Sequence, residues 1–352
     1  MNKMKTSDMS ILLLNNLPIE SGVGRYTYNL YASLKDENIQ ILNFPNYFDY
    51  KNRTFEGKII IPKFKNKIVN LMFNRIINES EMKFIYNFHG IVHYTNHNMP
   101  IYKTKALRIA TIHDFFPFEY KNLGVKWSIY LAYMQRNLKH ILKLENIIVT
   151  TNIMKYKLIN NYKYNGKIFV VPYSTSPNFI YLNSKTQIRK KLNFPENKIL
   201  VLSVSNDAPH KNLNILPNVM KLLGDDYLLV RVGKKIYNSI TIPYANNTLI
   251  NEIYNACDVL VFPSLDEGFG FPMIEAFATG LPVVASDIPV FHEIGGDAPI
   301  YVNNKDPESI ANGIRSAIAN KEEFTKKSLE RSKLYTFEEF KKKMISVYES
   351  LI

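Results

Sequence analysis

The sequence of 352 residues has a single cysteine and no long apolar run. Because Cys257 is alone, no intrachain disulfide can form, and its apolar neighbours predict a buried structural thiol. The early apolar run Ile11–Leu14 is shorter than the core of a signal peptide. All apolar stretches fall well below the roughly 20 residues that cross a bilayer. These absences predict a protein of a reducing compartment, with a cytoplasmic location.

Acidic residues are scarce in one part of a chain whose formal net charge is +13. Between Glu119 and Glu196 the only acidic residue is Glu145. The same span carries Lys121, Lys126, Arg136, Lys139, Lys143, Lys155, Lys157, Lys163, Lys167, Lys185, Arg189, Lys190 and Lys191. Such a field favours an anionic partner. Because no recognised nucleic-acid motif accompanies it, we expect no nucleic acid, and peripheral docking at the inner face of an anionic membrane is the hypothesis.

Length predicts two domains, and the hydrophobic pattern supports them. Expected strands are Ile11–Leu14, Ile59–Ile61, Ile91–Tyr94, Arg108–Ile112 and Ile147–Thr150, then Lys198–Ser203, Tyr227–Val232, Val259–Phe262 and Pro282–Ala285. Expected helices are Arg25–Leu34, Lys126–Leu144, Leu213–Leu223, Asn247–Asn255, Phe271–Ala278 and Ser309–Ala319. This alternation predicts two α/β units with parallel sheets. The expected domains are residues 1–172 plus a C-terminal helix in 336–352, and residues 173–335, with a linker in Pro172–Pro195.

A strand, a glycine-containing loop and a helix are expected in succession between Val259 and Ala278. Gly268 and Gly270 let a ligand approach the backbone, and the helix that begins near Phe271 offers free N–H groups and a positive dipole end. In a doubly wound sheet this junction lies at the carboxyl edge of the strands, where ligands bind. The segment therefore predicts a phosphate site.

Two carboxylates frame this loop. Glu267 precedes the helix, and Glu275, about one turn into it, can reach toward a ribose hydroxyl. On these residues alone, acids that merely cap the helix remain an alternative. However, Pro-Ser-Leu-Asp-Glu-Gly-Phe-Gly-Phe-Pro-Met-Ile-Glu-Ala at 263–276 resembles the signature of the retaining glycosyltransferases of family 4, and residues 280–286 and 293–298 also match its pattern. The resemblance implies two Rossmann-like domains (GT-B type) that face each other across a cleft.

Three further segments are similar to this family. Gly22–Thr27 resembles its N-terminal glycine loop, Thr111–Asp114 its histidine motif and Ser203–Leu213 its phosphate-binding loop. The resemblance implies catalytic roles for His113, Glu267 and Lys211, and donor binding by Gly22, Gly24, Arg25, Ser205, Lys211, Gly268, Phe269, Gly270 and Glu275. That last loop often carries an arginine as well. Asn206 and His210 occupy its candidate positions here, so a second cationic clamp stays open.

A metal is not expected, nor is any other cofactor. His89, His93 and His97 are spaced as on a metal-binding helix face, but Gly90 and the strand-like Ile91–Tyr94 argue against a helix. The chain also lacks the Asp-x-Asp clamp of glycosyltransferases with one Rossmann domain. A leaving diphosphate would then be stabilised by fixed dipoles and cations.

These patterns together predict a retaining glycosyltransferase that moves a hexose from a GDP- or UDP-sugar to a glycan or lipid-linked acceptor. A sugar-nucleotide epimerase of the same architecture is one alternative. A non-catalytic protein that binds nucleotide sugars is another, and a nucleic-acid binder would follow from charge alone.

Overall fold

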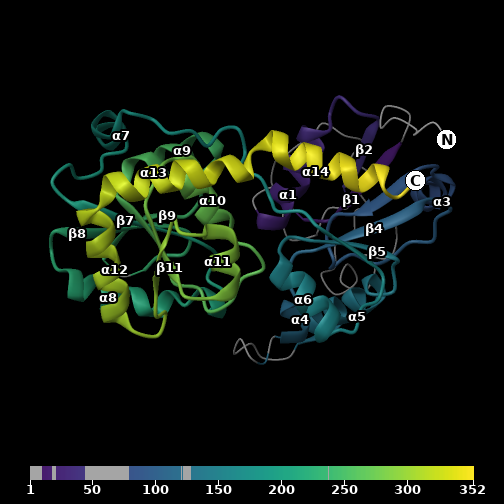
Figure 1. The fold of residues 1–352 in the computed structure, drawn as a ribbon, viewed down its shortest axis with the longest axis horizontal. Helices are drawn as coiled ribbons and strands as arrows, with labels where there is room; N and C mark the ends of the chain where they lie inside the picture. Colours follow the sequence, from purple (N-terminus) through teal and green to yellow (C-terminus); the bar gives the residue numbers. More distant parts are fainter. Residues whose placement is uncertain (1–9, 18–20, 44–78, 120, 122–127, 237) are drawn as a thin grey trace. The chain divides into compact units, whose positions relative to one another are not determined.

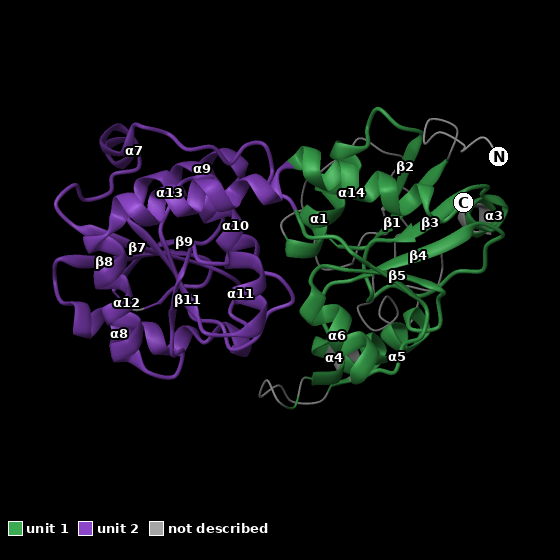
Figure 2. Cartoon of the chain, viewed as in Figure 1, with its two compact units in different colours: residues 1–122, 126–173, 337–352 green, residues 123–125, 174–336 purple. Residues whose placement is uncertain are grey.

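The computed structural model describes residues 10–17, 21–43, 79–119, 121, 128–236 and 238–352. They form two compact units (Figure 2): unit 1 holds the described residues up to Tyr173 with Phe337–Ile352, and unit 2 holds Ser174–Thr336. Each division falls one residue after the expected boundary. The expected strand Ile59–Ile61 lies outside the described residues.

In the described part of unit 1, six parallel strands form one sheet in the order β2-β1-β3-β4-β5-β6. Of these, β1, β2, β4 and β5 are labelled in Figure 1. The strands are β1 (Ile11–Asn15), β2 (Ile39–Asn43), β3 (Ile91–Tyr94), β4 (Leu107–Ile112), β5 (Asn146–Val149) and β6 (Lys167–Val170). The strand order reverses between β1 and β3, because β2 pairs with one edge of β1 and β3 with the other. The carboxyl ends of β1 and β3 therefore mark the place where doubly wound sheets bind ligands.

The helices of unit 1 are α1 (Gly22–Ser33), α3 (Glu79–Asn87), α4 (Phe116–Glu119), α5 (Ile129–Ile141), α6 (Asn152–Asn160) and α14 (Phe337–Glu349). Helix α1 begins at Gly22, not at Arg25, which corrects the expected loop at Gly22 and Gly24. The cause is Ser21, whose hydroxyl accepts from Gly24 N at 2.9 Å and caps the helix. At the chain's C-terminal end, α14 packs on α1, with the Phe340 and Tyr26 rings 5.9 Å apart.

Unit 2 contains a second parallel sheet, in the order β12-β11-β10-β7-β8-β9. Its strands are β7 (Ile199–Val204), β8 (Tyr227–Val232), β9 (Ser239–Ile242), β10 (Val259–Phe262), β11 (Val283–Ser286) and β12 (Ile300–Val302). Its helices are α7 (Lys185–Lys191), α8 (Leu216–Leu223), α9 (Asn247–Ala256), α10 (Phe271–Ala278), α11 (Pro289–Gly295), α12 (Pro307–Ala319) and α13 (Lys321–Ser332), with short 3-10 helices at Pro209–Lys211, Leu213–Ile215 and Lys333–Tyr335. Strands β7 and β10 are almost wholly apolar because helices cover both faces of the sheet.

The expected linker Pro172–Pro195 is not a linker along its length. Residues from Ser174 onward belong to unit 2, where α7 buries Ile188 and Arg189. The interpretation rested on prolines and polar residues, but the short α7 docks through the side chain of Ile188 and the ion pair of Arg189 with Asp258. Cys257 is buried as expected, and burial raises the pKa of its thiol.

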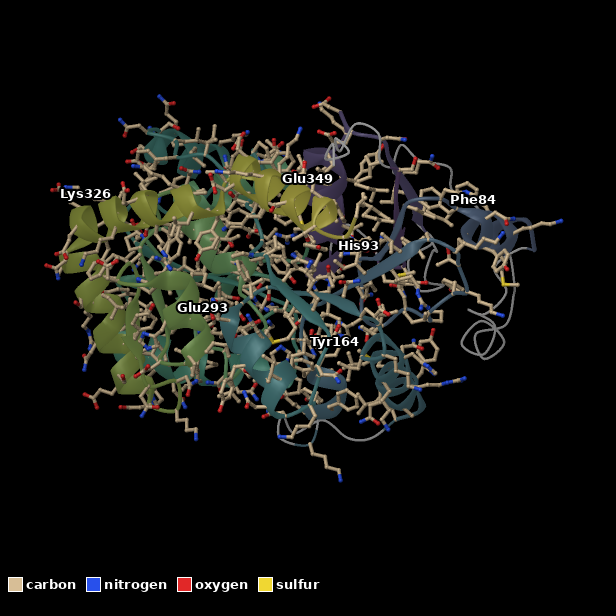
Figure 3. All side chains as sticks on the ribbon, turned by 45° about the vertical axis from the view of Figure 1, so that its right-hand side comes forward. Phe84, His93, Tyr164, Glu293, Lys326 and Glu349 are labelled. Carbon is tan, nitrogen blue, oxygen red and sulfur yellow. The ribbon has the colours of Figure 1, made fainter. Side chains whose placement is uncertain are left out.

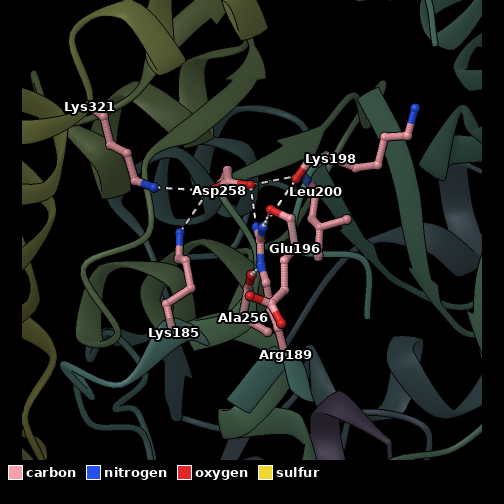
Figure 4. A network of polar contacts seen from close by, with 8 residues as sticks. All are labelled: Lys185, Arg189, Glu196, Lys198, Leu200, Ala256, Asp258 and Lys321. Carbon is pink, nitrogen blue, oxygen red and sulfur yellow. Dashed lines mark hydrogen bonds and ion pairs between the residues drawn. The ribbon is translucent and has the colours of Figure 1, made fainter. Parts of the chain in front are cut away.

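A carboxylate ties together the amino ends of β7 and β10 in unit 2 (Figure 4). One oxygen of Asp258 accepts from Lys185 Nζ at 2.7 Å and Lys321 Nζ at 2.9 Å. The other accepts from Arg189 Nη2 at 2.5 Å and Leu200 N at 2.8 Å. Burial alone would raise the pKa of Asp258, but Lys185 and Lys321 hold it well below its usual range. The carboxylate is therefore charged and joins α7, α13 and both central strands.

Candidate functional site

The carboxyl edge of the unit 2 sheet brings the expected site residues of that unit together. Strands β7 and β10 are neighbours, and the chain order reverses between them, since β8 and β9 extend the sheet on one side and β11 and β12 on the other. Ser205 and Lys211 follow β7, whereas Glu267–Gly270 follow β10. The structure thus places both loops at the switch point of the sheet.

Lys211 and Glu267 meet across these two loops. Lys211 Nζ lies 2.6 Å from Glu267 Oε1, and both side chains are largely buried, at 15% and 9% exposed. Ser264 Oγ donates to the same carboxylate oxygen at 2.8 Å. Because an ammonium group has three donors, Lys211 can hold Glu267 and an anion at once. The pair joins residues 56 positions apart in sequence, which only the parallel sheet could bring together.

Two asparagines lock the loops that carry this pair. Asn212 has a left-handed backbone (φ 54°), and its side-chain amide donates to Pro263 O at 3.2 Å and Asn304 O at 2.7 Å. Asn304 in turn donates to Ser264 O at 3.1 Å. The loops after β7, β10 and β12 are therefore bonded to one another. Neither asparagine was identified from the sequence, although asparagine is one of the residues that tolerate a left-handed backbone in a turn.

Helix α10 begins beside this pair without a side-chain cap. Its N-cap is Gly270, with φ 116°, and a Cβ there would lie 3.1 Å from Phe262 and 3.2 Å from Phe291. Glycine is thus required by the backbone angle, and the two rings leave little room for a side chain. The N-terminus of α10 carries a partial positive charge that suits a phosphate. Phe269, in contrast, is buried against Tyr335, with ring centroids 5.9 Å apart, so its side chain packs inside unit 2.

Glu275 lies inside the second turn of α10 and is 2% exposed. Its Oε2 accepts from the hydroxyl of Tyr254 on α9 at 2.8 Å. Tyr254 was not identified from the sequence, because its contact with Glu275 depends on how α9 packs against α10. The contact of Glu275 with a ribose stays a prediction.

Arg231 is a further residue of this edge that the sequence interpretation missed. It is fully buried on β8, and its guanidinium donates to Ser205 O at 2.6 Å and Ser205 Oγ at 3.1 Å. Gly233 follows with φ 131°, and a Cβ there would lie 2.4 Å from Ser205 O. The arginine within the apolar strand Tyr-Leu-Leu-Val-Arg-Val could have indicated this residue, because arginine is rarely fully buried unless its charge is paired.

In unit 1, the expected glycines lie in the first turn of α1, directly after β1. Gly24 is buried and Gly22 exposed, and Arg25 N donates to Ser21 O at 2.9 Å. The start of this 12-residue helix is at the carboxyl end of β1, where its dipole favours an anion. Gly22, Gly24 and Arg25 are thus grouped, and their contact with donor phosphates stays a prediction.

His113 follows β4 and is buried in unit 1. Its Nε2 lies 2.6 Å from the carbonyl oxygen of Thr95, and its Nδ1 contacts the hydroxyl of Tyr173. A carbonyl can only accept, so Nε2 carries the proton and Tyr173 donates to Nδ1. Burial, assisted by nearby His97, lowers the pKa of His113 to about 3, so the ring is neutral near pH 7. Both ring nitrogens are used within unit 1, and the contact of His113 with a sugar stays a prediction.

His93 belongs to a chain of buried polar side chains. It lies on β3 inside unit 1 (Figure 3), with Nδ1 2.7 Å from Tyr348 Oη and Nε2 2.8 Å from Thr111 Oγ1. The hydroxyl of Tyr26 lies 2.8 Å from the same Thr111 oxygen. Burial lowers the pKa of His93 to about 3. Within the described ranges, no three His, Cys, Asp or Glu residues are grouped to hold a metal.

The chain is similar to several known proteins. Residues 184–333 match the family described as glycosyl transferases group 1. The O-antigen chain mannosyltransferase RfbU of Salmonella typhimurium is 27% identical over 238 residues, a match that spans 63% of this chain and 63% of RfbU.

Solved structures agree with the fold over nearly the whole length. Sucrose-phosphate synthase from Thermosynechococcus elongatus superposes with a TM-score of 0.77 at 18% identity, covering 97% of this chain and 99% of that one. Anabaena Alr3699/HepE, solved with UDP and glucose, superposes with a TM-score of 0.73 at 14% identity, covering 97% and 100%. The chain therefore has the two-unit α/β fold of GT-B type, and its residues 184–333 match the model of the glycosyl transferases group 1 family.

Proposed function

We propose that this protein is a retaining glycosyltransferase that moves a hexose from a nucleotide-diphosphate sugar to a glycan or lipid-linked acceptor. The ion pair between Lys211 and Glu267 at the sheet's switch point, next to the start of α10, is the observation that carries the proposal. The group 1 domain supports the reaction class. The name of RfbU, an O-antigen chain mannosyltransferase, favours mannose as the sugar and a surface polysaccharide as the product.

The reaction requires positive charge from the protein next to the leaving group. As the anomeric carbon loses its diphosphate, negative charge develops on the phosphate oxygens. Lys211 and the amide end of α10 would stabilise it from fixed positions, with no reorganisation during the reaction. Glu267, held by Lys211 and Ser264, would bind donor sugar hydroxyls, and Glu275 the ribose. We include no metal in this proposal.

Donor identity and reaction class are tested on the full chain. We expect one of the UDP-, GDP- and dTDP-sugars to raise the melting temperature, because a ligand that binds only the folded state stabilises it. Incubation with that donor and a glycan or lipid-linked acceptor should then yield nucleoside diphosphate and a glycosylated acceptor. Conversion of the donor alone into an epimeric nucleotide sugar would favour the epimerase, whereas binding without turnover of any acceptor would favour the non-catalytic alternative.

We also propose that unit 1 docks on an anionic lipid surface. Arg136 and Lys139 are exposed on α5, and Lys163 follows α6. On α6 itself, Tyr156 and Ile159 are 65% and 42% exposed. Cations together with exposed aromatic and aliphatic side chains suit the interface of an acidic bilayer. Within the described ranges every helix is too short or too polar to span a bilayer.

Vesicle flotation tests this docking. The protein should float with vesicles that contain about a third anionic lipid and stay behind with neutral ones, since each cation near the surface adds ~1 kcal/mol. The double change Lys139→Glu and Lys163→Glu should abolish flotation, whereas Lys221→Glu, on an exposed position of α8, should not. Flotation that is indifferent to anionic lipid would exclude this surface.

A further inference from the structure

Arg231 is a buried cation whose described partners are all uncharged. Its side chain has no exposed surface, and it donates to the carbonyl oxygens of Ser203 at 3.1 Å, Val232 at 2.9 Å and Asn206 at 3.4 Å, besides those contacts with Ser205. Among the described residues none of the ion pairs includes Arg231, and its Nε has no hydrogen-bond partner. A buried charge without an opposite charge is costly, which calls for a function that offsets the cost.

The guanidinium remains charged at neutral pH. Burial lowers the pKa of Arg231 to about 10, and the charge of Asp207 opposes that shift. The carboxylate of Asp207 is itself paired with Lys234 at 3.2 Å, on the exposed side of the loop. The positive charge of Arg231 is therefore available to whatever lies on the loop after β7.

The contacts of Arg231 orient that loop. The carbonyl groups of Ser205 and Asn206 both face the guanidinium. The described chain has no cis peptide bond, and in a trans peptide unit the C=O and the N–H point in opposite directions. The N–H groups of Asn206 and Asp207 are thus turned to the other side of the loop, where the N–H of Asp207 faces the exposed carboxylate of its own residue. Successive N–H groups on one side of a turn, with Lys211 four residues further on, are the elements of an anion site.

We propose that Arg231 is a positioning residue and a buried counter-charge for a diphosphate that binds on the outer side of the loop at Ser205–Lys211. The inference deepens the proposed function, on which it rests, by assigning the second positive charge of the donor site to a strand residue behind the backbone. It answers the question that Asn206 and His210 left open, because the missing cation of the loop lies on β8. Gly233 is needed for the same arrangement, because only glycine leaves room for the carbonyl oxygen of Ser205.

The test uses inorganic pyrophosphate as the probe, with calorimetry on the full chain. Arg231→Gln should weaken pyrophosphate binding about tenfold or more, and Arg231→Lys, which keeps the charge, should recover part of it. The affinity for the nucleoside of the preferred donor should not change, because it carries no phosphate. Arg315→Gln is the matched control: Arg315, at an exposed position of α12, donates to Leu222 O and Asn312 Oδ1, and its loss should leave pyrophosphate affinity unchanged.

Several outcomes would overturn the inference. These are unchanged pyrophosphate affinity in Arg231→Gln, an equal loss of pyrophosphate and nucleoside affinity, and a wild-type chain that binds no pyrophosphate. If Arg231→Gln does not fold, Gly233→Ala takes its place, because a Cβ there displaces Ser205 O and should weaken pyrophosphate in the same way. A chain that binds pyrophosphate through Arg231 but transfers no sugar would contradict the proposed function alone.

Discussion

Replacing Lys211 with methionine is expected to lower turnover about 100-fold or more, as the loss of one preorganised charge does at other sites of developing negative charge. Methionine keeps the length and apolar stem of lysine but removes the ammonium that lies 2.6 Å from Glu267 Oε1. Because the stabilised charge appears only as the diphosphate leaves, kcat should fall more than the Michaelis constant for the donor rises. Initial rates with the donor found by thermal shift measure both.

Lys211→Met also removes the positive charge that pairs with the buried carboxylate of Glu267. Circular dichroism and the melting temperature should therefore be used to check that the variant is folded. Lys221→Met makes the same change at an exposed position of α8 and should keep wild-type turnover. Lys211→Arg keeps the charge and should fall between the two. Near-normal turnover by a folded Lys211→Met chain would remove Lys211 from the site and, with it, the main support for the proposed function.

Replacing Asp258 with asparagine is expected to lower the free energy of unfolding by about 3 kcal/mol, at the lower end for a buried ion pair that loses one partner. The change leaves Lys185, Lys321 and Arg189 facing one another without an anion. The two lysines are 33% and 39% exposed, which is why the loss should not reach the upper end of the range. Urea unfolding followed by circular dichroism gives the difference.

A double variant separates charge repulsion from lost packing. Lys185→Met in the Asp258→Asn background removes one of three uncompensated cations and should restore part of the stability. Asp287→Asn, an exposed aspartate whose Oδ1 lies 2.6 Å from His292 Nε2, is the control and should change stability by less than about 0.5 kcal/mol. If Asp258→Asn and Asp287→Asn lowered the free energy of unfolding equally, the ion pairs around Asp258 would stabilise the fold no more than an exposed ion pair does.

The stability difference between the wild type and Asp258→Asn should depend on pH. The pKa of Asp258 is held below its unfolded value by the lysines, so its contribution is complete above about pH 4 and declines as pH falls toward the folded pKa. The difference in stability between the wild type and Asp258→Asn should therefore shrink from pH 6 to pH 3. A difference that stays constant or grows with acid would contradict the assigned charge state.

Most of the unit 2 scaffold could be predicted from sequence because local signals there are strong. The strand Val259–Phe262 and the helix Phe271–Ala278 have the predicted bounds, since a short apolar run ends at Pro263 and Pro272 marks the first turn. The start of α1 was predicted wrongly, because Gly22 and Gly24 suggested a loop. In the structure both lie in the first turn of the helix, which Ser21 caps. The half-buried strand β9 and the short β12 were not predicted, because neither has a fully buried apolar pattern.

Two α/β units, the loop between β10 and α10, and the candidate residues Lys211, Glu267 and Glu275 can be predicted from the sequence, because each depends on neighbours a few positions apart. The contacts of Lys211 with Glu267, of Tyr254 with Glu275 and of Arg231 with Ser205 are visible only in the folded chain. Those pairs join loops and helices whose meeting depends on the order of parallel strands. Pairing of that kind is set by the packing of the whole sheet, and no local pattern along the chain encodes it.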